Sequence, residues 1–232
     1  MIKRIINIST VILLLTPFVI LAQNPTLSNK KLTILTLGDS NGTFPMSWPQ
    51  QLTKAFPNAK ICNISKSGRT IGFLNLGDST LNSLFVVDQN LKKAAAFTGN
   101  TPYDFVIIEL GTNDAKAVFN NQQKEVPQNL DKLINKIKDS PYTTIKHAKI
   151  IIISPPPYGA KAENTVKYAG GNQRVEAMSK AFKKVANRQH CFFVNGFSTP
   201  GLNIETMTTD GIHLDSLGSR KLIEPVISLL AK

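Results

Sequence analysis

Short apolar runs alternate with amphipathic stretches along most of this chain. Residues 32–37 (LTILTL), 105–110 (FVIIEL) and 149–153 (KIIII) are apolar or β-branched, and the first of them stops at a glycine. Runs of this length and composition are typical of buried strands. Two weaker runs, residues 59–64 and 191–194, complete a prediction of five strands.

Between these runs, apolar residues recur every three or four positions, which is the period of a helix with one buried face. The clearest case has Leu130, Leu133 and Ile137 on one face and begins at Pro127, a residue suited to a first helical turn. The same reasoning predicts helices over residues 48–56, 84–97, 127–138, 172–188 and 217–230, the last bent or interrupted at Pro225.

Strands that alternate with helices predict a parallel sheet covered on both faces, which is a three-layer α/β/α fold. Right-handed crossovers and ligand binding where the strand order reverses favour a flavodoxin-like five-stranded parallel sheet of order 2-1-3-4-5. In that order Cys62 and Cys191 lie on opposite edge strands. A disulfide requires Cα atoms within ~7 Å, so we expect both thiols to be free.

The amino terminus has the features of a secretory signal peptide. Lys3 and Arg4 precede an apolar run that ends near Ala22, a small residue suited to cleavage. The run is shorter than the ~20 residues of a membrane span, so a retained anchor is the weaker interpretation. We predict an exported protein, periplasmic or extracellular, without a stable membrane anchor; its parts are a signal peptide (1–22), a polar lead-in (23–30) and one domain (31–232).

The chain is basic, with 27 Lys and Arg against 15 Asp and Glu and a net charge of +12. A basic balance often marks proteins that bind nucleic acid. Here the lysines are scattered along predicted helices instead of being gathered into an arm. A solvated surface is therefore the better interpretation, and we expect no nucleic-acid partner. No His/Cys/Asp cluster has metal-ligand spacing and no common phosphate-binding glycine loop occurs, so we expect no metal and no cofactor.

Ser40 is the first candidate for chemistry. It ends the tripeptide Gly38-Asp39-Ser40 directly after the first strand, where open α/β sheets place their ligands. The tripeptide alone is a weak signal, because residues 77–79 repeat it with no strand in front. A serine hydroxyl is a poor nucleophile unless a neighbouring base removes its proton.

His213 is the only good candidate for that base. The other histidines, His147 and His190, precede the fourth and fifth strands and so lie at the opposite end of the sheet. Asp210 stands three residues before His213, where its carboxylate could accept the Nδ1 proton and fix the tautomer. Taken alone, Asp210 is equally typical of a helix cap or a turn. His213 taken alone is equally typical of an ordinary surface histidine.

Acyl transfer also needs donors for the oxyanion that develops at the substrate. Three groups at predicted strand ends are suitable: the backbone N–H of Ser40, the backbone N–H of Gly68 and the side-chain amide of Asn113. Glycine allows close approach of a backbone to a ligand. Glycine and asparagine are also common in ordinary turns, so Gly68 and Asn113 are equally compatible with a purely structural role.

The chain resembles the SGNH hydrolase superfamily, also called GDSL esterases, over residues 31–232. The resemblance lies in four blocks that follow one another in order: the Gly-Asp-Ser block, the loop glycine Gly68, Gly111-Thr112-Asn113-Asp114 and Asp210-Gly211-Ile212-His213. The resemblance implies Ser40 as nucleophile, Ser40, Gly68 and Asn113 as oxyanion donors, and Asp210 with His213 completing the triad. Asn41 is a departure from the family pattern, because many members of the superfamily have a leucine at this position. Three stretches look like the arylesterase and acyltransferase branch: VIIELGTNDAKAVF, KIIIISPPPYG and DGIHLDSLGSRKL.

We therefore expect a secreted carboxylic-ester hydrolase that acts through an acyl-enzyme on Ser40 and favours short acyl groups such as acetyl, on a carbohydrate or other small-molecule ester. Two alternatives are a lysophospholipase or thioesterase of the same superfamily and a non-catalytic carbohydrate-binding relative. Glu109, inside the third strand, is expected to support the structure. Trp48, Arg69 and Lys116 are expected near the pocket.

Overall fold

A five-stranded parallel sheet forms the middle layer of the computed structural model, which describes residues 29–232. The strand order is β2-β1-β3-β4-β5, as predicted. The predicted signal peptide lies outside the described residues, as does most of the lead-in. The strands are β1 (Thr33–Gly38), β2 (Lys60–Asn63), β3 (Phe105–Glu109), β4 (Lys149–Ile153) and β5 (Phe192–Val194).

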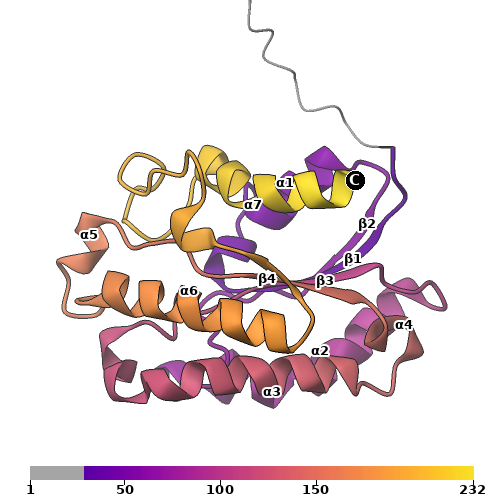
Figure 1. Cartoon of the computed structure of the whole chain (residues 1–232), viewed down its shortest axis with the longest axis horizontal. Helices are drawn as coiled ribbons and strands as arrows, with labels where there is room; N and C mark the ends of the chain where they lie inside the picture. Colours follow the sequence, from indigo (N-terminus) through magenta and orange to yellow (C-terminus); the bar gives the residue numbers. More distant parts are fainter. Residues whose placement is uncertain (1–28) are drawn as a thin grey trace, which may run out of the picture.

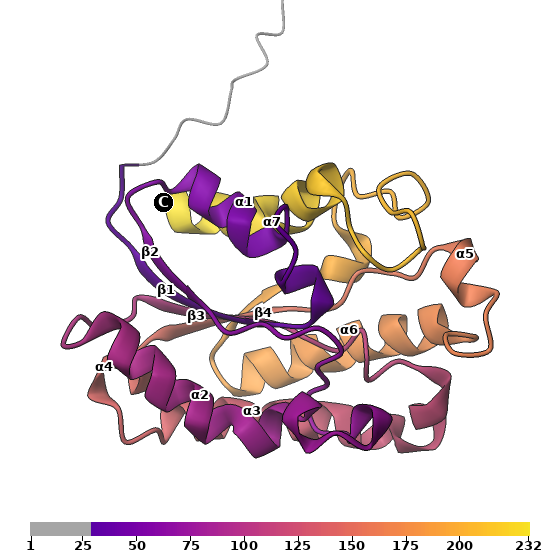
Figure 2. The same ribbon diagram turned by 180° about the vertical axis from the view of Figure 1, so that it is seen from behind.

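Helices cover both faces of the sheet (Figures 1 and 2). One face carries α1 (Trp48–Ala55) and α7 (Ser216–Ala231), and the other carries α2 (Ser83–Thr98), α3 (Val126–Lys138) and α6 (Gly171–Arg188). Pro225 lies inside α7 without interrupting it. Sequence periodicity missed the short helices α4 (Thr143–Lys146) and α5 (Ala160–Glu163) and the 3₁₀ segments at 40–42, 75–77, 79–81, 117–125 and 196–198.

Each face of the sheet packs against its own hydrophobic core. Side chains alternate between faces along a strand, so Ile34 and Ile107 join the core under α1 and α7, whereas Leu35 and Val106 join the larger core under α2, α3 and α6. Burial on both faces explains why the central strands are continuous apolar runs. Cys62 and Cys191 are both free, as expected.

The parallel strands end at one edge of the sheet, and the polar loops follow there. The loop after β1 carries Ser40, the loop after β2 carries Gly68 and the loop after β3 carries Asn113. The segment between β5 and α7 brings His213 to the same edge, 173 residues from Ser40 in sequence. Among residues 29–232, no helix has the length and apolar character needed to cross a bilayer.

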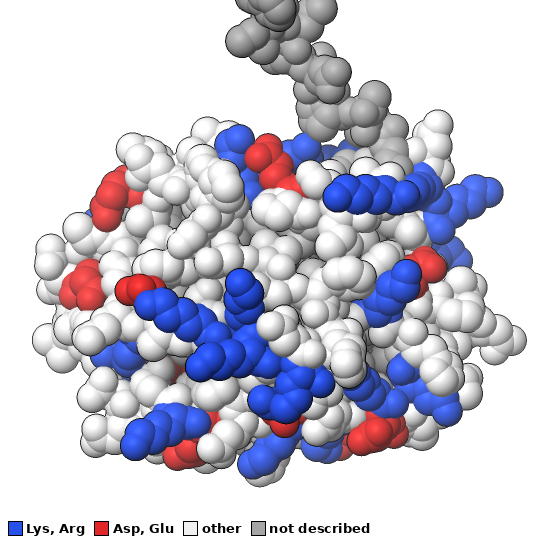
Figure 3. All heavy atoms as spheres, viewed as in Figure 1, with Lys and Arg blue, Asp and Glu red and all other residues white. Residues whose placement is uncertain are grey.

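Basic side chains gather in the middle of one face of the molecule (Figure 3). They lie over α6 and the neighbouring α3, whose contributions include Lys132, Lys184 and Arg188 around a shallow groove. Asp131 lies among them and pairs with Arg188 at 3.0 Å. This surface is separate from the edge where the polar loops converge.

Candidate active site

The turn after β1 places Ser40 at the bottom of a cavity of about 250 Å³. Asp39 makes this turn, because its Oδ1 accepts a hydrogen bond from the backbone N–H of Asn41 at 3.0 Å and caps the 3₁₀ turn over residues 40–42. Ser40 is only 4% exposed, yet its side chain lines the cavity. The second Gly-Asp-Ser, at residues 77–79, lies on an exposed loop.

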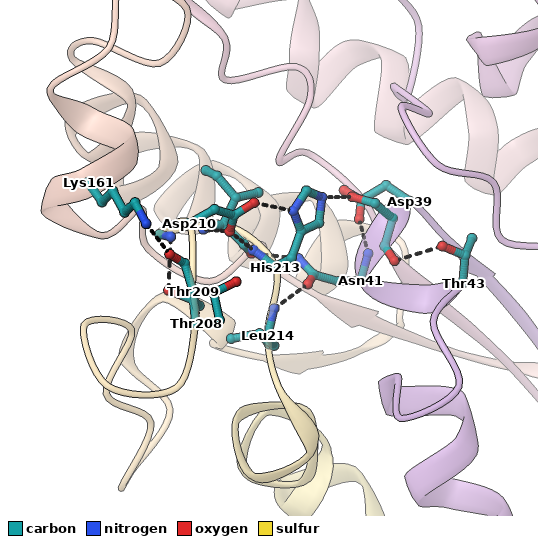
Figure 4. A network of polar contacts seen from close by, with 12 residues as sticks. Asp39, Asn41, Thr43, Lys161, Thr208, Thr209, Asp210, His213 and Leu214 are labelled. Carbon is teal, nitrogen blue, oxygen red and sulfur yellow. Dashed lines mark hydrogen bonds and ion pairs between the residues drawn. The ribbon is translucent and has the colours of Figure 1, made fainter.

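The imidazole of His213 lies between the Ser40 hydroxyl and the Asp210 carboxylate. Figure 4 shows His213 beside Asp210. Its Nε2 is 3.0 Å from the Oγ of Ser40, and its Nδ1 is 2.5 Å from Oδ2 of Asp210. The ring of Phe44 packs edge-on against the imidazole, with 5.3 Å between centroids. The three side chains thus form a continuous hydrogen-bonded relay from carboxylate to hydroxyl.

The carboxylate of Asp210 is held by its own loop. Its Oδ1 accepts the backbone N–H groups of Ile212 and His213 at 2.9 and 2.8 Å, while Oδ2 faces the imidazole. Partial burial acts to raise the pKa of Asp210, but these hydrogen bonds outweigh it and hold the pKa below its ordinary value. Asp210 is therefore ionised at neutral pH and favours a proton on Nδ1 of His213.

Asn41 holds the segment that carries His213. Its Nδ2 donates to the carbonyl oxygen of Ile212 at 3.2 Å, and its Oδ1 accepts from the N–H of Leu214 at 2.9 Å (Figure 4). The side chain is 1% exposed. These two bonds lie on either side of His213 and tie its backbone to the residue after Ser40. Sequence analysis assigned Asn41 no role, although its departure from the leucine of many family members was the available signal.

Three N–H donors converge on the same cavity. The backbone N–H groups of Ser40 and Gly68 donate no hydrogen bond to any residue within 29–232. Asn113 uses one Nδ2 hydrogen on the carbonyl oxygen of Arg69 at 3.1 Å, which orients the amide and leaves its second hydrogen. Ser40, Gly68 and Asn113 all line the cavity with His213. An oxygen carrying negative charge would be well placed among them.

Comparison with known proteins identifies the family of the chain. The sequence profile of the GDSL-like lipase/acylhydrolase family matches residues 34–221. The chain belongs to that family. The enzyme class that follows is carboxylic-ester hydrolase.

Solved structures share the fold of this acylhydrolase. A carbohydrate acetylesterase from Sinorhizobium meliloti is 23% identical over 87% of this chain and 99% of its own, with a TM-score of 0.71. The inhibitor-bound aryl esterase of M. smegmatis is 22% identical over 86% of this chain and 98% of its own, with a TM-score of 0.67. No curated protein sequence matches the chain significantly.

In this acylhydrolase, buried polar groups hold the loop after β2, which carries Gly68. Both carboxylate oxygens of Asp114 lie 3.0 Å from the backbone nitrogen of Ile71, and the side chain of Asn75 donates to the carbonyl oxygen of Gly68 at 2.6 Å. Gly68 has φ +79°, a conformation that side-chain-bearing residues rarely adopt. The loop after β3 thus fixes the loop after β2.

Three carboxyl groups lie completely buried beneath the site. Burial raises the pKa of Asp39 to about 6 and that of Asp114 to about 7, despite backbone hydrogen bonds to each. Burial and the neighbouring Asp39 raise the pKa of Glu109 well above its ordinary value. Glu109 accepts a hydrogen bond from Nε1 of Trp48 at 3.2 Å, so it is structural, as expected.

Of the three residues expected near the pocket, only Lys116 lines it. Trp48 starts α1 and is fully buried in the core on the α1/α7 face, where its ring packs and its Nε1 meets Glu109. Arg69 turns away, because its Nη1 donates to the carbonyl oxygen of Ile64 at 2.7 Å. Within residues 29–232, no group of three or more His, Cys, Asp and Glu could hold a metal ion.

Proposed function

We propose that Ser40, His213 and Asp210 are the catalytic triad of an exported esterase that removes short acyl groups, foremost acetyl, from carbohydrate or aryl esters. One observation carries the proposal: a single imidazole lies 3.0 Å from the Ser40 hydroxyl and 2.5 Å from a carboxylate. Hydrogen bonds of this length allow His213 to act as base and then as acid.

The reaction follows from these roles. As Oγ of Ser40 attacks the ester carbonyl carbon, Nε2 of His213 takes its proton, and Asp210 stabilises the imidazolium. The carbonyl oxygen becomes an oxyanion that accepts hydrogen bonds from the N–H of Ser40, the N–H of Gly68 and the amide of Asn113. Collapse breaks the bond to the alcohol, which takes the proton from His213. Water repeats the sequence and releases the acid.

The size of the cavity supports a short acyl group, since about 250 Å³ must hold the acyl group and part of the alcohol. One observation favours the alternative of a lysophospholipase or thioesterase. An apolar groove of about 400 Å³ adjoins the cavity and is lined by Leu74, Leu76, Val118 and Phe119. A longer acyl chain would lie in that groove.

The decisive experiment compares Ser40→Ala with Ser79→Ala. Ser79 provides a matched control, because it ends the second Gly-Asp-Ser on an exposed loop. We expect 4-nitrophenyl acetate and acetylated sugars to be hydrolysed by the wild type and by Ser79→Ala, and activity to fall by a factor of about 10⁴ or more in Ser40→Ala. A fluorophosphonate should label the Ser40 peptide.

Other outcomes point to the alternatives. Hydrolysis that rises steeply from acetyl to octanoyl and longer esters would favour the lipase or thioesterase. Absence of hydrolysis and of labelling, with retained binding of a carbohydrate, would favour the non-catalytic relative. Export is tested by expressing the chain with its own amino terminus, where the mature protein should begin at Gln23.

A further inference from the structure

The cavity beside Ser40 is positively charged. Its lining includes Lys116 and Lys167, and no Asp or Glu is among the described residues that line it. The two lysines come from different segments, one after β3 and the other after α5. The backbone N–H of Ala117 donates to the carbonyl oxygen of Lys167 at 3.0 Å, so the backbone itself holds the two segments side by side.

Lys116 is buried without a carboxylate partner. It is 5% exposed, and within residues 29–232 its Nζ makes one hydrogen bond, to the neutral Oδ1 of Asn75 at 3.1 Å. An ammonium group has three donors, so two remain. The charges that act on it are Lys167, Asp39 and Asp114, and both carboxyls lie below the cavity instead of lining it.

The charge of Lys116 is retained at the expense of stability. Burial, followed by the like charge of Lys167, lowers the pKa of Lys116 to about 8, which still leaves it mostly protonated at neutral pH. Lys167 is exposed, and its Nζ lies 5.0 Å from the ring centroid of Tyr168, another lining residue. Two cations at one cavity wall repel each other. An anion between them would offset this repulsion and would accept hydrogen bonds from the unused N–H groups of Lys116.

We propose that the ester cleaved at Ser40 carries a carboxylate, in its acyl or its alcohol part, that binds the ammonium groups of Lys116 and Lys167. This inference rests on the proposed esterase function and narrows its substrate to anionic esters, such as acetylated acidic sugars. The hydroxyl, the imidazole and the two lysines line one small cavity, so a single small substrate reaches all of them.

The test uses pairs of esters that differ in charge at nearly constant shape. On the alcohol side, 4-acetoxybenzoate is compared with its methyl ester; on the acyl side, mono-4-nitrophenyl glutarate is compared with 4-nitrophenyl pentanoate. The readout is the kcat/KM of the anionic ester divided by that of its neutral partner, each corrected for the rate of alkaline hydrolysis. We expect wild type to prefer the anion in at least one pair and NaCl to weaken the preference.

Charge-removing variants locate the preference. We expect Lys116→Gln to lower this ratio about tenfold and the more exposed Lys167→Gln to lower it a few-fold. Lys60→Gln is the control, because it removes the same charge at the amino end of β2, at the opposite end of the sheet, and should leave the ratio unchanged. Thermal unfolding shows whether Lys116→Gln is folded, and Lys167→Gln tests the proposal on an exposed residue.

The outcomes separate this inference from the proposed function. Equal ratios in wild type, Lys116→Gln, Lys167→Gln and Lys60→Gln, with neutral esters still hydrolysed through Ser40, would overturn the anionic substrate and leave the esterase intact. An ester panel with no hydrolysis at all would overturn both.

Discussion

At the scale of single residues, Asn41 shows how a side chain next to the proposed nucleophile, Ser40, can position the proposed base, His213. Its amide satisfies two backbone groups on either side of His213, from a position that is itself held by Asp39. Replacing it by leucine leaves a buried carbonyl oxygen and a buried N–H without this partner, each at a cost of about 1–3 kcal/mol. The loop could then shift, and the imidazole with it.

We predict that Asn41→Leu lowers kcat on the order of tenfold or more while KM changes little, because a misplaced base slows chemistry more than binding. Steady-state kinetics on 4-nitrophenyl acetate separate the two constants. Asn195→Leu is the control: the side chain of Asn195 takes part in two hydrogen bonds, accepting from the hydroxyl of Ser179 and the backbone N–H of Ser198, and neither involves the His213 loop. An equal fall in kcat in both variants would contradict a positioning role for Asn41.

Asn113 is the side-chain member of the proposed oxyanion hole. Removing one such donor costs about 3 kcal/mol of transition-state stabilisation, so Asn113→Ala should lower kcat by hundreds-fold. Its amide also bonds the carbonyl oxygen of Arg69, and a loss of stability is expected as well. Activity is therefore compared at a temperature where thermal unfolding shows the variant to be folded. An unchanged kcat would remove Asn113 from the site.

At the scale of elements, the parallel strands end at one edge of the sheet, and the loops that follow them carry the candidate catalytic residues. The loop after β2 is held from outside and from within, since Asp114 from the loop after β3 holds it at Ile71 and its own Asn75 bonds the carbonyl oxygen of Gly68. Gly68 has a left-handed backbone and lines the cavity. A side chain there would strain the loop that carries this proposed oxyanion donor.

We predict that Gly68→Ala destabilises the protein by about 1–2 kcal/mol, the cost of a positive φ for alanine, and also lowers kcat. An added Cβ would lie 3.4 Å from Asn75 and Leu81, which is ordinary van der Waals contact, so the strain arises from the φ of +79° and not from a clash. Gly99→Ala is the matched control, because Gly99 has φ +59° and open space around it at the end of α2. It should lose comparable stability and retain activity. Equal kcat in both variants would argue against Gly68 as a donor.

At the scale of the whole molecule, the buried carboxyls link stability to pH. Asp39, Glu109 and Asp114 have pKa values raised in the fold, so the folded state holds protons that the unfolded chain has released. Their contribution is present below the ordinary carboxyl pKa near 4 and is lost as pH rises through the folded values of about 6 and 7 for Asp39 and Asp114. These groups therefore favour the folded state more at pH 5 than at pH 8.

We predict that Glu109→Gln raises the Tm at pH 7 and changes it little at pH 4, because glutamine keeps an acceptor for Trp48 and removes the need to protonate a buried acid. Thermal unfolding of both proteins between pH 4 and pH 8 measures the difference. A lower Tm of Glu109→Gln at pH 7 would mean that Glu109 is ionised and stabilising in the fold.

The architecture and the list of candidate residues could be read from the chain because both depend on local patterns. Apolar runs and helical periods predicted the strands and their order. Short blocks at the strand ends predicted that Ser40, Gly68, Asn113, Asp210 and His213 lie close together. Other features depend on the direction of side chains in space. Three such features are the burial of Trp48 in the core, the hydrogen bonds from Asn41 to residues 212 and 214, and the placement of Lys116 and Lys167 at one cavity. They arise from packing between segments far apart in sequence, which no local pattern encodes.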